Sequence, residues 1–134
     1  MTPSHNDIKY MAHIAKELFE ERTGLTTLPL RLRFLNAAWM EAHLDGCDLP
    51  NVIATSRRTS TENTIVISED YLKTEAATKE DIFCTLLHEI AHEFHTGHPE
   101  EFYDLLETCG IRIGDYHTPT HEQRSETWIG KLPC

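Results

Sequence analysis

The spacing of apolar residues changes along the first third of the chain. Between residues 7 and 22 they recur every three or four positions, which is the spacing of one helix face. These apolar residues are Ile8, Met11, Ile14, Ala15, Leu18 and Phe19. Gly24 follows where such a helix would stop, because glycine readily adopts the left-handed conformation that ends helices. Residues 28–35 then alternate between apolar and polar, with Arg31 and Arg33 on the polar side, which predicts a half-buried strand.

Two more strands are predicted in the middle of the chain, at 51–56 and at 64–68. The run between them, RRTSTEN, is polar and typical of a hairpin turn. The preceding stretch, which contains Trp39 and the turn-like pair Asp45-Gly46, has no clear period. We therefore expect a hairpin here, as part of a small and mainly antiparallel sheet of about three strands.

Two helices are predicted in the second half. Thr78 with Asp81 three positions later has the signature of a capping box and predicts the start of the first one. Pro99 is well placed as the first residue of the second helix, and Gly110 is expected to close it. The order of elements predicts a single α+β domain over residues 1–134, with an irregular tail over about 111–134.

Charge and composition narrow the expected partners. Twelve Lys and Arg against 22 Asp and Glu give a net charge of −10, which repels phosphate backbones. The basic clusters are limited to Arg31/Arg33 and Arg57/Arg58. The four cysteines form no CxxC pair, and we recognise neither a secretory signal nor an apolar run long enough to cross a bilayer. We expect a cytoplasmic protein that acts on a protein or peptide, without strong nucleic-acid binding and without a membrane.

The chemistry is concentrated in a cluster of histidines, because four of the nine fall between residues 88 and 98. His88 and His92 are four residues apart, so on a helix both imidazoles could reach one ion. Glu89 lies beside His88, near enough to take a proton from a metal-bound water. This is the physical content of the HExxH motif, and it predicts Zn²⁺ as cofactor with Glu89 as general base.

A catalytic zinc site needs a third protein ligand and an open position. His98 follows Gly97 and precedes Pro99, so the chain could leave the first helix and turn back toward the metal there. His95 is the competitor, but a continued helix would place it a turn beyond His92 and in line with it. The geometry favours His98. Four side chains could support the ligands or stabilise an oxyanion, and sequence does not choose among them: His95, Tyr103, Tyr116 and His117.

The run TLLHEIAHEFHTGHPEEFYDLL resembles the core of SprT-like and WLM-type zinc metallopeptidases. The shared features are HExxH, the Gly97-His98 step and Phe102 four residues after that histidine. The upstream run TIVISEDYL is also similar, so the resemblance covers about 64–106. It implies a minimal zincin fold, His98 as third ligand, and proteolysis, in some members of proteins crosslinked to DNA. The absence of CxxC pairs and the acidic charge depart from SprT proteins and count against a role on DNA, although the family analogy keeps nucleic acid open.

Three other interpretations use the same residues. The metzincin pattern is rejected, because position 95 is His where that pattern has Gly and no Met follows Met40. Another zinc hydrolase stays open: YbeY-like endoribonucleases share the histidine spacing but have Gly in place of Glu89, and peptide deformylases have a Gly-Cys ligand that Gly46-Cys47 faintly resembles. The third is a non-catalytic zincin-like protein for binding or assembly. The sequence favours a zinc metallopeptidase.

Overall fold

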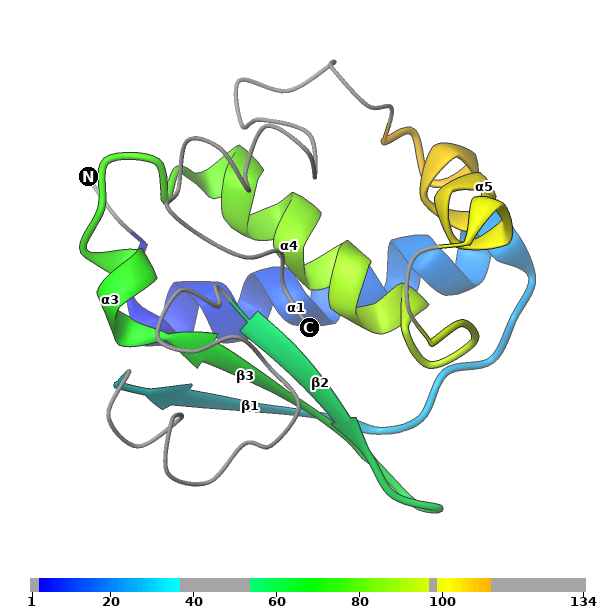
Figure 1. Ribbon diagram of the computed structural model, residues 1–134, viewed down its shortest axis with the longest axis horizontal. Coiled ribbons are helices and arrows are strands. Elements are labelled where there is room, and N and C mark those ends of the chain that lie inside the picture. The colour runs from blue at the N-terminus through cyan, green and yellow to red at the C-terminus, as the bar shows by residue number, and fades with distance from the viewer. Residues whose placement is uncertain (1–2, 37–53, 97–98, 112–134) are drawn as a thin grey trace.

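The computed structural model describes residues 3–36, 54–96 and 99–111 of the 134-residue chain (Figure 1). The predicted strand residues 51–53, the proposed ligand His98, and the predicted tail after residue 111 with Tyr116 and His117 lie outside the described residues. The elements are α1 (His5–Thr23), β1 (Leu30–Leu35), β2 (Ala54–Arg58), β3 (Asn63–Ser68), α3 (Glu69–Leu72), α4 (Lys79–Ala91) and α5 (Glu100–Thr108). The described part is thus a mixture of helices and one small sheet, which confirms the α+β prediction.

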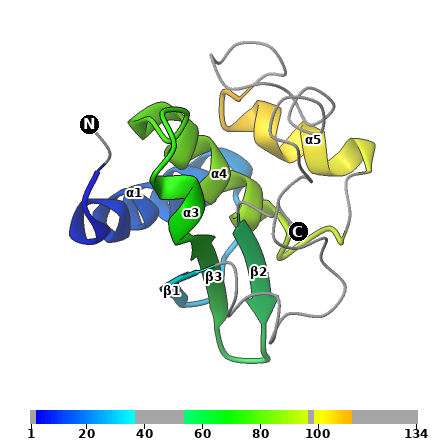
Figure 2. The ribbon, with the colours of Figure 1, turned by 60° about the vertical axis from the view of Figure 1, so that its left-hand side comes forward.

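The sheet has the strand order β1-β3-β2 among the described residues. β2 and β3 pair antiparallel, as the predicted hairpin requires (Figure 2), but β1 and β3 pair parallel. Of the two strand pairs among the described residues, one is antiparallel and the other is parallel. The prediction of a mainly antiparallel sheet was therefore wrong. A tight hairpin turn forces the antiparallel pairing of its strands, whereas a long connection such as the one between β1 and β2 permits either direction.

Local capping signals explain the bounds of α1. Ser4 and Asp7 form a reciprocal capping box, in which Ser4 Oγ accepts the Asp7 N–H at 3.1 Å and Asp7 Oδ2 accepts the Ser4 N–H at 3.2 Å. Gly24 ends the helix with φ +74°, the left-handed conformation that glycine adopts without strain. The buried stripe is narrower than the sequence suggested, since Ile14 is 39% exposed.

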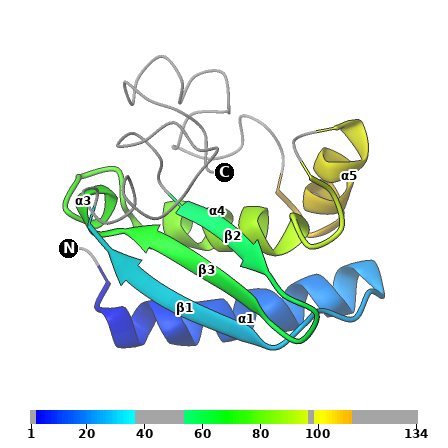
Figure 3. The same cartoon turned by 60° about the horizontal axis from the view of Figure 1, so that its bottom comes forward.

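The core lies between the sheet and the pair α1 and α4. Figure 3 shows both helices on the same side of the sheet, with α1 against β1 and α4 against β2. The register places alternate residues of the strands on this face, with Ile65 and Ile67 of β3 and Leu86 and Leu87 of α4 fully buried. Burial of each such side chain stabilises the fold by about 1.5–3 kcal/mol.

The start of α4 is fixed by hydrogen bonds to the segment before it. Thr78 Oγ1 accepts the Asp81 N–H at 3.1 Å, which confirms the predicted helix start. The buried Asp81 carboxylate accepts a hydrogen bond from the hydroxyl of Tyr71 in α3. Ser68 ends β3 and caps α3 by accepting the Tyr71 N–H at 3.2 Å. The chain from β3 into α4 is therefore held by a continuous set of polar contacts.

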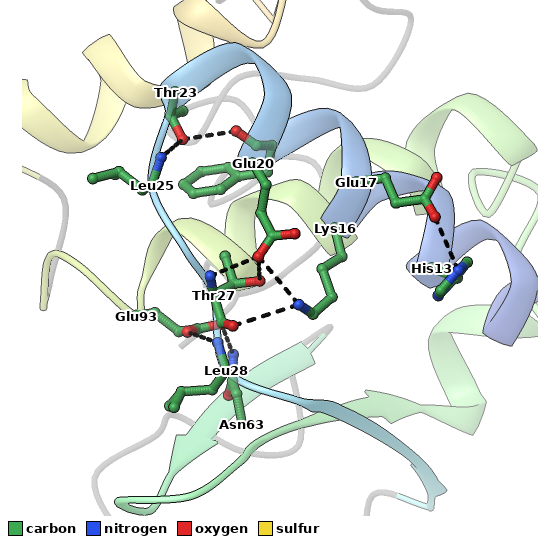
Figure 4. Close-up of polar contacts among 11 residues, drawn as sticks. His13, Lys16, Glu17, Glu20, Thr23, Leu25, Thr27, Leu28, Asn63 and Glu93 are labelled. Carbon is green, nitrogen blue, oxygen red and sulfur yellow. Dashed lines mark hydrogen bonds and ion pairs between the residues drawn. The ribbon is translucent and has the colours of Figure 1, made fainter.

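The connection from α1 to β1 is held by Glu20 (Figure 4). Its Oε2 accepts the Thr27 N–H at 2.8 Å and the Thr27 hydroxyl at 2.9 Å, and Lys16 Nζ lies 3.3 Å away. The backbone N–H and then the hydroxyl of Thr27 stabilise the charged carboxylate and lower the pKa of Glu20 below its ordinary value of 4.5.

The helix α5 begins at Glu100, one residue later than predicted, and Pro99 is its N-cap. Gly110 follows the last turn of α5 with φ +88°.

In the described part of the chain, no helix combines the length and the apolar character needed to cross a bilayer.

The Glu20 interaction predicts a pH dependence of stability. Because the folded-state pKa of Glu20 is lowered, its contribution is fully present above about pH 4.5 and is lost as the pH falls through the lower folded-state value. We expect Glu20→Gln to reduce the free energy of unfolding by about 1 kcal/mol at pH 7 and to weaken its decline below pH 4.5. Urea unfolding from pH 7 to pH 3 measures both effects. Glu17→Gln is the control, since Glu17 is 67% exposed and its ion pair is with the equally exposed His13; equal losses in the two variants would contradict the prediction.

Candidate metal centre

The last two turns of α4 bring two imidazoles together. His88 and His92 are buried, and their Nε2 atoms lie 3.2 Å apart. Two nitrogens that are each about 2.05 Å from a tetrahedral zinc ion would lie roughly 3.3 Å apart. The separation therefore fits two ligands of one ion. At this distance one Nε2–H can donate to the other Nε2, whereas both nitrogens would have to present a lone pair to a shared ion.

The backbone after α4 selects the tautomer of His92. The helix ends at Ala91 with His92 as its cap, and the following turn brings the carbonyl oxygen of His95 to 3.0 Å from His92 Nδ1. Nδ1–H therefore donates to this carbonyl, which leaves the lone pair of Nε2 for a metal. Burial lowers the pKa of His92 below its ordinary value of 6.5, and the charge of Arg58 lowers it further, while the bond to His95 opposes them. The ring is thus kept in the neutral form that binds metals.

Glu89 completes the cluster. Its side chain is fully buried, and Oε2 lies 4.0 Å from His88 Nε2. Within the described ranges, His88, Glu89 and His92 form the one group of at least three potential ligand residues, with ligand atoms all within 4.8 Å of one another. A carboxylate at this place could accept a proton from a water held between it and an ion, which is the role the sequence predicted for Glu89.

An aromatic side chain from α5 forms one wall of the site. The ring of Phe102 is fully buried, stacks on His92 with centroids 4.6 Å apart, and meets His88 edge-on at 4.8 Å. Tyr103, half-buried, contacts Phe102 edge-on at 5.5 Å. Phe102 was noted in the sequence as part of the family resemblance, without a predicted role at the site, yet its ring restricts the rotation of both imidazoles. Two ligand rings in fixed orientations are what a metal site requires.

The turn after His92 also separates the two candidates for third ligand. The N–H groups of Phe94 and His95 both donate to the carbonyl of Ala91, at 3.0 Å and 3.3 Å, so the helix does not continue regularly to His95. His95 is not a member of the ligand cluster, and its backbone carbonyl contacts the site instead. His98, the favoured candidate, lies outside the described residues. The same holds for Tyr116 and His117, the candidate oxyanion groups in the tail.

Sequence reasoning missed Glu93. It directly follows His92, and both carboxylate oxygens accept hydrogen bonds, Oε1 from the Leu28 N–H at 2.9 Å and Oε2 from Asn63 Nδ2 at 3.0 Å (Figure 4). Its backbone carbonyl accepts a bond from Arg58. A glutamate after HExxH carries no local signal of these contacts, because its partners are 65 and 30 residues away in sequence.

No family model, no curated protein and no solved structure matches this chain. The resemblance to SprT-like and WLM-type peptidases therefore rests on the motif residues alone.

The packing of Phe102 predicts a large loss of stability on truncation. We expect Phe102→Ala to lower the free energy of unfolding by about 3–5 kcal/mol, because it leaves a cavity beside both imidazoles. Urea denaturation of the metal-free protein measures this. Tyr10→Ala is a matched aromatic control, since Tyr10 is 67% exposed and should change stability by no more than about 0.5 kcal/mol. A small effect of Phe102→Ala would show that this ring is not part of the core.

Proposed function

We propose that this protein is a zinc-dependent peptidase in which His88, His92 and His98 hold the ion and Glu89 is the general base. The observation that carries the proposal is the pair of Nε2 atoms 3.2 Å apart beside a fully buried carboxylate. The α+β arrangement, with the HExxH residues on a helix packed against a three-stranded sheet, is compatible with a minimal zincin fold.

The residues of the site have distinct tasks in this reaction. A bound zinc ion would lower the pKa of a water ligand to about 7 and polarise the scissile carbonyl. Glu89 takes the proton from the attacking water and returns it to the leaving amine. The burial of Glu89 strengthens the attraction between its carboxylate and a bound cation, because water screens charges less at a buried site. His92 is held in the ligand tautomer by the carbonyl of His95, and Phe102 keeps both rings in place.

The proposal takes His98 as third ligand for two reasons. The ring of His95 is outside the ligand cluster, and the chain has already left the helix before that residue. Pro99, which directly follows His98, caps the helix whose Phe102 contacts both imidazoles. A ligand just before this helix would approach the ion from a different side than α4 does, as a tetrahedral site requires.

The decisive experiment is cleavage of an unfolded protein by the zinc-loaded wild type and by Glu89→Gln. We expect the variant to retain one equivalent of zinc and to lose turnover by at least about 100-fold, because general acid–base catalysis contributes roughly 10²–10⁴. Glu107→Gln, on the exposed side of α5, is the control and should cleave like the wild type. Equal rates for Glu89→Gln and the wild type would exclude the mechanism. Zinc binding without cleavage by the wild type would favour the non-catalytic alternative.

The third ligand is tested by two alanine variants. His98→Ala should weaken zinc binding strongly, whereas His95→Ala should leave it nearly unchanged, because the hydrogen bond of His95 to His92 is made by the backbone carbonyl, which alanine retains. Competition with a chromogenic chelator measures both dissociation constants. The opposite order would identify His95 as the ligand.

A further inference from the structure

A partly buried polar network ties the residue after His92 to two strands of the sheet. The Glu93 carboxylate accepts bonds from the Leu28 N–H, just before β1, and from Asn63 Nδ2, the first residue of β3. Asn63 is fully buried, and its Oδ1 accepts the Ser56 hydroxyl of β2 at 2.7 Å. Since a carboxylate only accepts hydrogen bonds, the direction of each hydrogen bond in this network is fixed.

The backbone of Glu93 is held as firmly as its side chain. Its N–H donates to the Ile90 carbonyl at 3.0 Å, and its own carbonyl accepts a bond from Arg58 at the end of β2. The turn that starts at Glu93 is the one that returns the His95 carbonyl to His92 Nδ1. The direction in which this turn leaves α4 therefore depends on where Glu93 is anchored.

We propose that Glu93 is a positioning residue for the metal ligand His92. It anchors the turn after α4 to the sheet, so that the His95 carbonyl holds the His92 imidazole with Nε2 toward the ion. This inference rests on the proposed metal site and extends it from the HExxH residues to the contacts that orient them. Hydrogen-bond partners of ligating imidazoles influence metal affinity about 10–100-fold, and Glu93 acts one step further out, through the backbone.

The test uses a reversal of hydrogen-bond direction. Glu93→Gln turns one carboxylate oxygen into an NH₂ group. With Asn63 in the orientation in which its Oδ1 accepts the Ser56 hydroxyl, either Leu28 N–H or Asn63 Nδ2 then faces a donor instead of an acceptor. Asn63→Asp alone places a second carboxylate against Glu93. The double variant Asn63→Asp/Glu93→Gln restores every bond: the Gln NH₂ donates to the Asp, which still accepts the Ser56 hydroxyl, and the Gln oxygen still accepts the Leu28 N–H.

Two quantities are measured for each variant: the zinc dissociation constant, by chelator competition under conditions where all variants are folded, and the stability of the metal-free protein. We expect Glu93→Gln to weaken zinc binding about tenfold and the double variant to regain most of that loss. Glu20→Gln is the matched control. Glu20 anchors the same connection between α1 and β1 through its hydrogen bonds with Thr27. These hydrogen bonds do not involve the turn after His92. It should lose stability and keep its zinc affinity.

A second readout follows the tautomer directly. The ¹⁵N chemical shifts of the His92 ring in the metal-free protein report the fraction with the proton on Nδ1. This fraction should fall in Glu93→Gln and recover in the double variant, and a purely structural role of Glu93 would not change it.

Unchanged zinc affinity and an unchanged tautomer in Glu93→Gln, with only its stability reduced, would overturn the positioning role and leave the proposed peptidase intact. If the wild type itself binds no zinc, both proposals fall.

Discussion

Two carboxylates, one in α1 and one just after α4, hold one short piece of chain between α1 and β1. Glu20 of α1 accepts the N–H of Thr27, and Glu93, after the end of α4, accepts the N–H of Leu28. In the next step of the chain, the carbonyl of Pro29 accepts the Asn63 N–H at 2.9 Å, which starts the parallel pairing of β1 with β3. Buried or half-buried donors in a connection need such acceptors. The contacts that satisfy them here also fix the end of α4 to the sheet.

The helix α4 is thus held at both ends, and its rotation about its own axis is set by the apolar residues that it buries. Asp81 is bonded to Tyr71 at the start, and Glu93 is bonded to the sheet just past the end. Between them Leu86, Leu87 and Ile90 are fully buried against the rest of the core. A helix fixed at three places along its length cannot turn without breaking one of these contacts. The orientation of His88 and His92 is therefore a property of the whole fold.

The sequence predicted what local physics determines. The periodicity of α1, the left-handed Gly24 and the N-cap Thr78 depend on residues within a few positions of one another, and all three were confirmed. The parallel direction of β1 depends on a pairing across about 30 residues, which no local pattern encodes. The same limit applies to the site: spacing brought His88, Glu89 and His92 together, but the packing of Phe102 on the imidazoles and the bonds of Glu93 follow from the tertiary fold.

The electrostatics of α4 favour a cation at this place. The carbonyl groups at the C-terminal end of a helix carry a partial negative charge, and α4 ends at Ala91, beside His92. A fully buried glutamate lies in the same region, and its carboxylate, when ionised, adds to this negative potential. Burial lowers the pKa of His92, which disfavours its protonation and keeps the imidazole in the neutral form. A divalent ion held by the two Nε2 atoms would interact favourably with both the helix end and Glu89. The negative potential of this region would thus add to the binding of a metal by the two imidazoles.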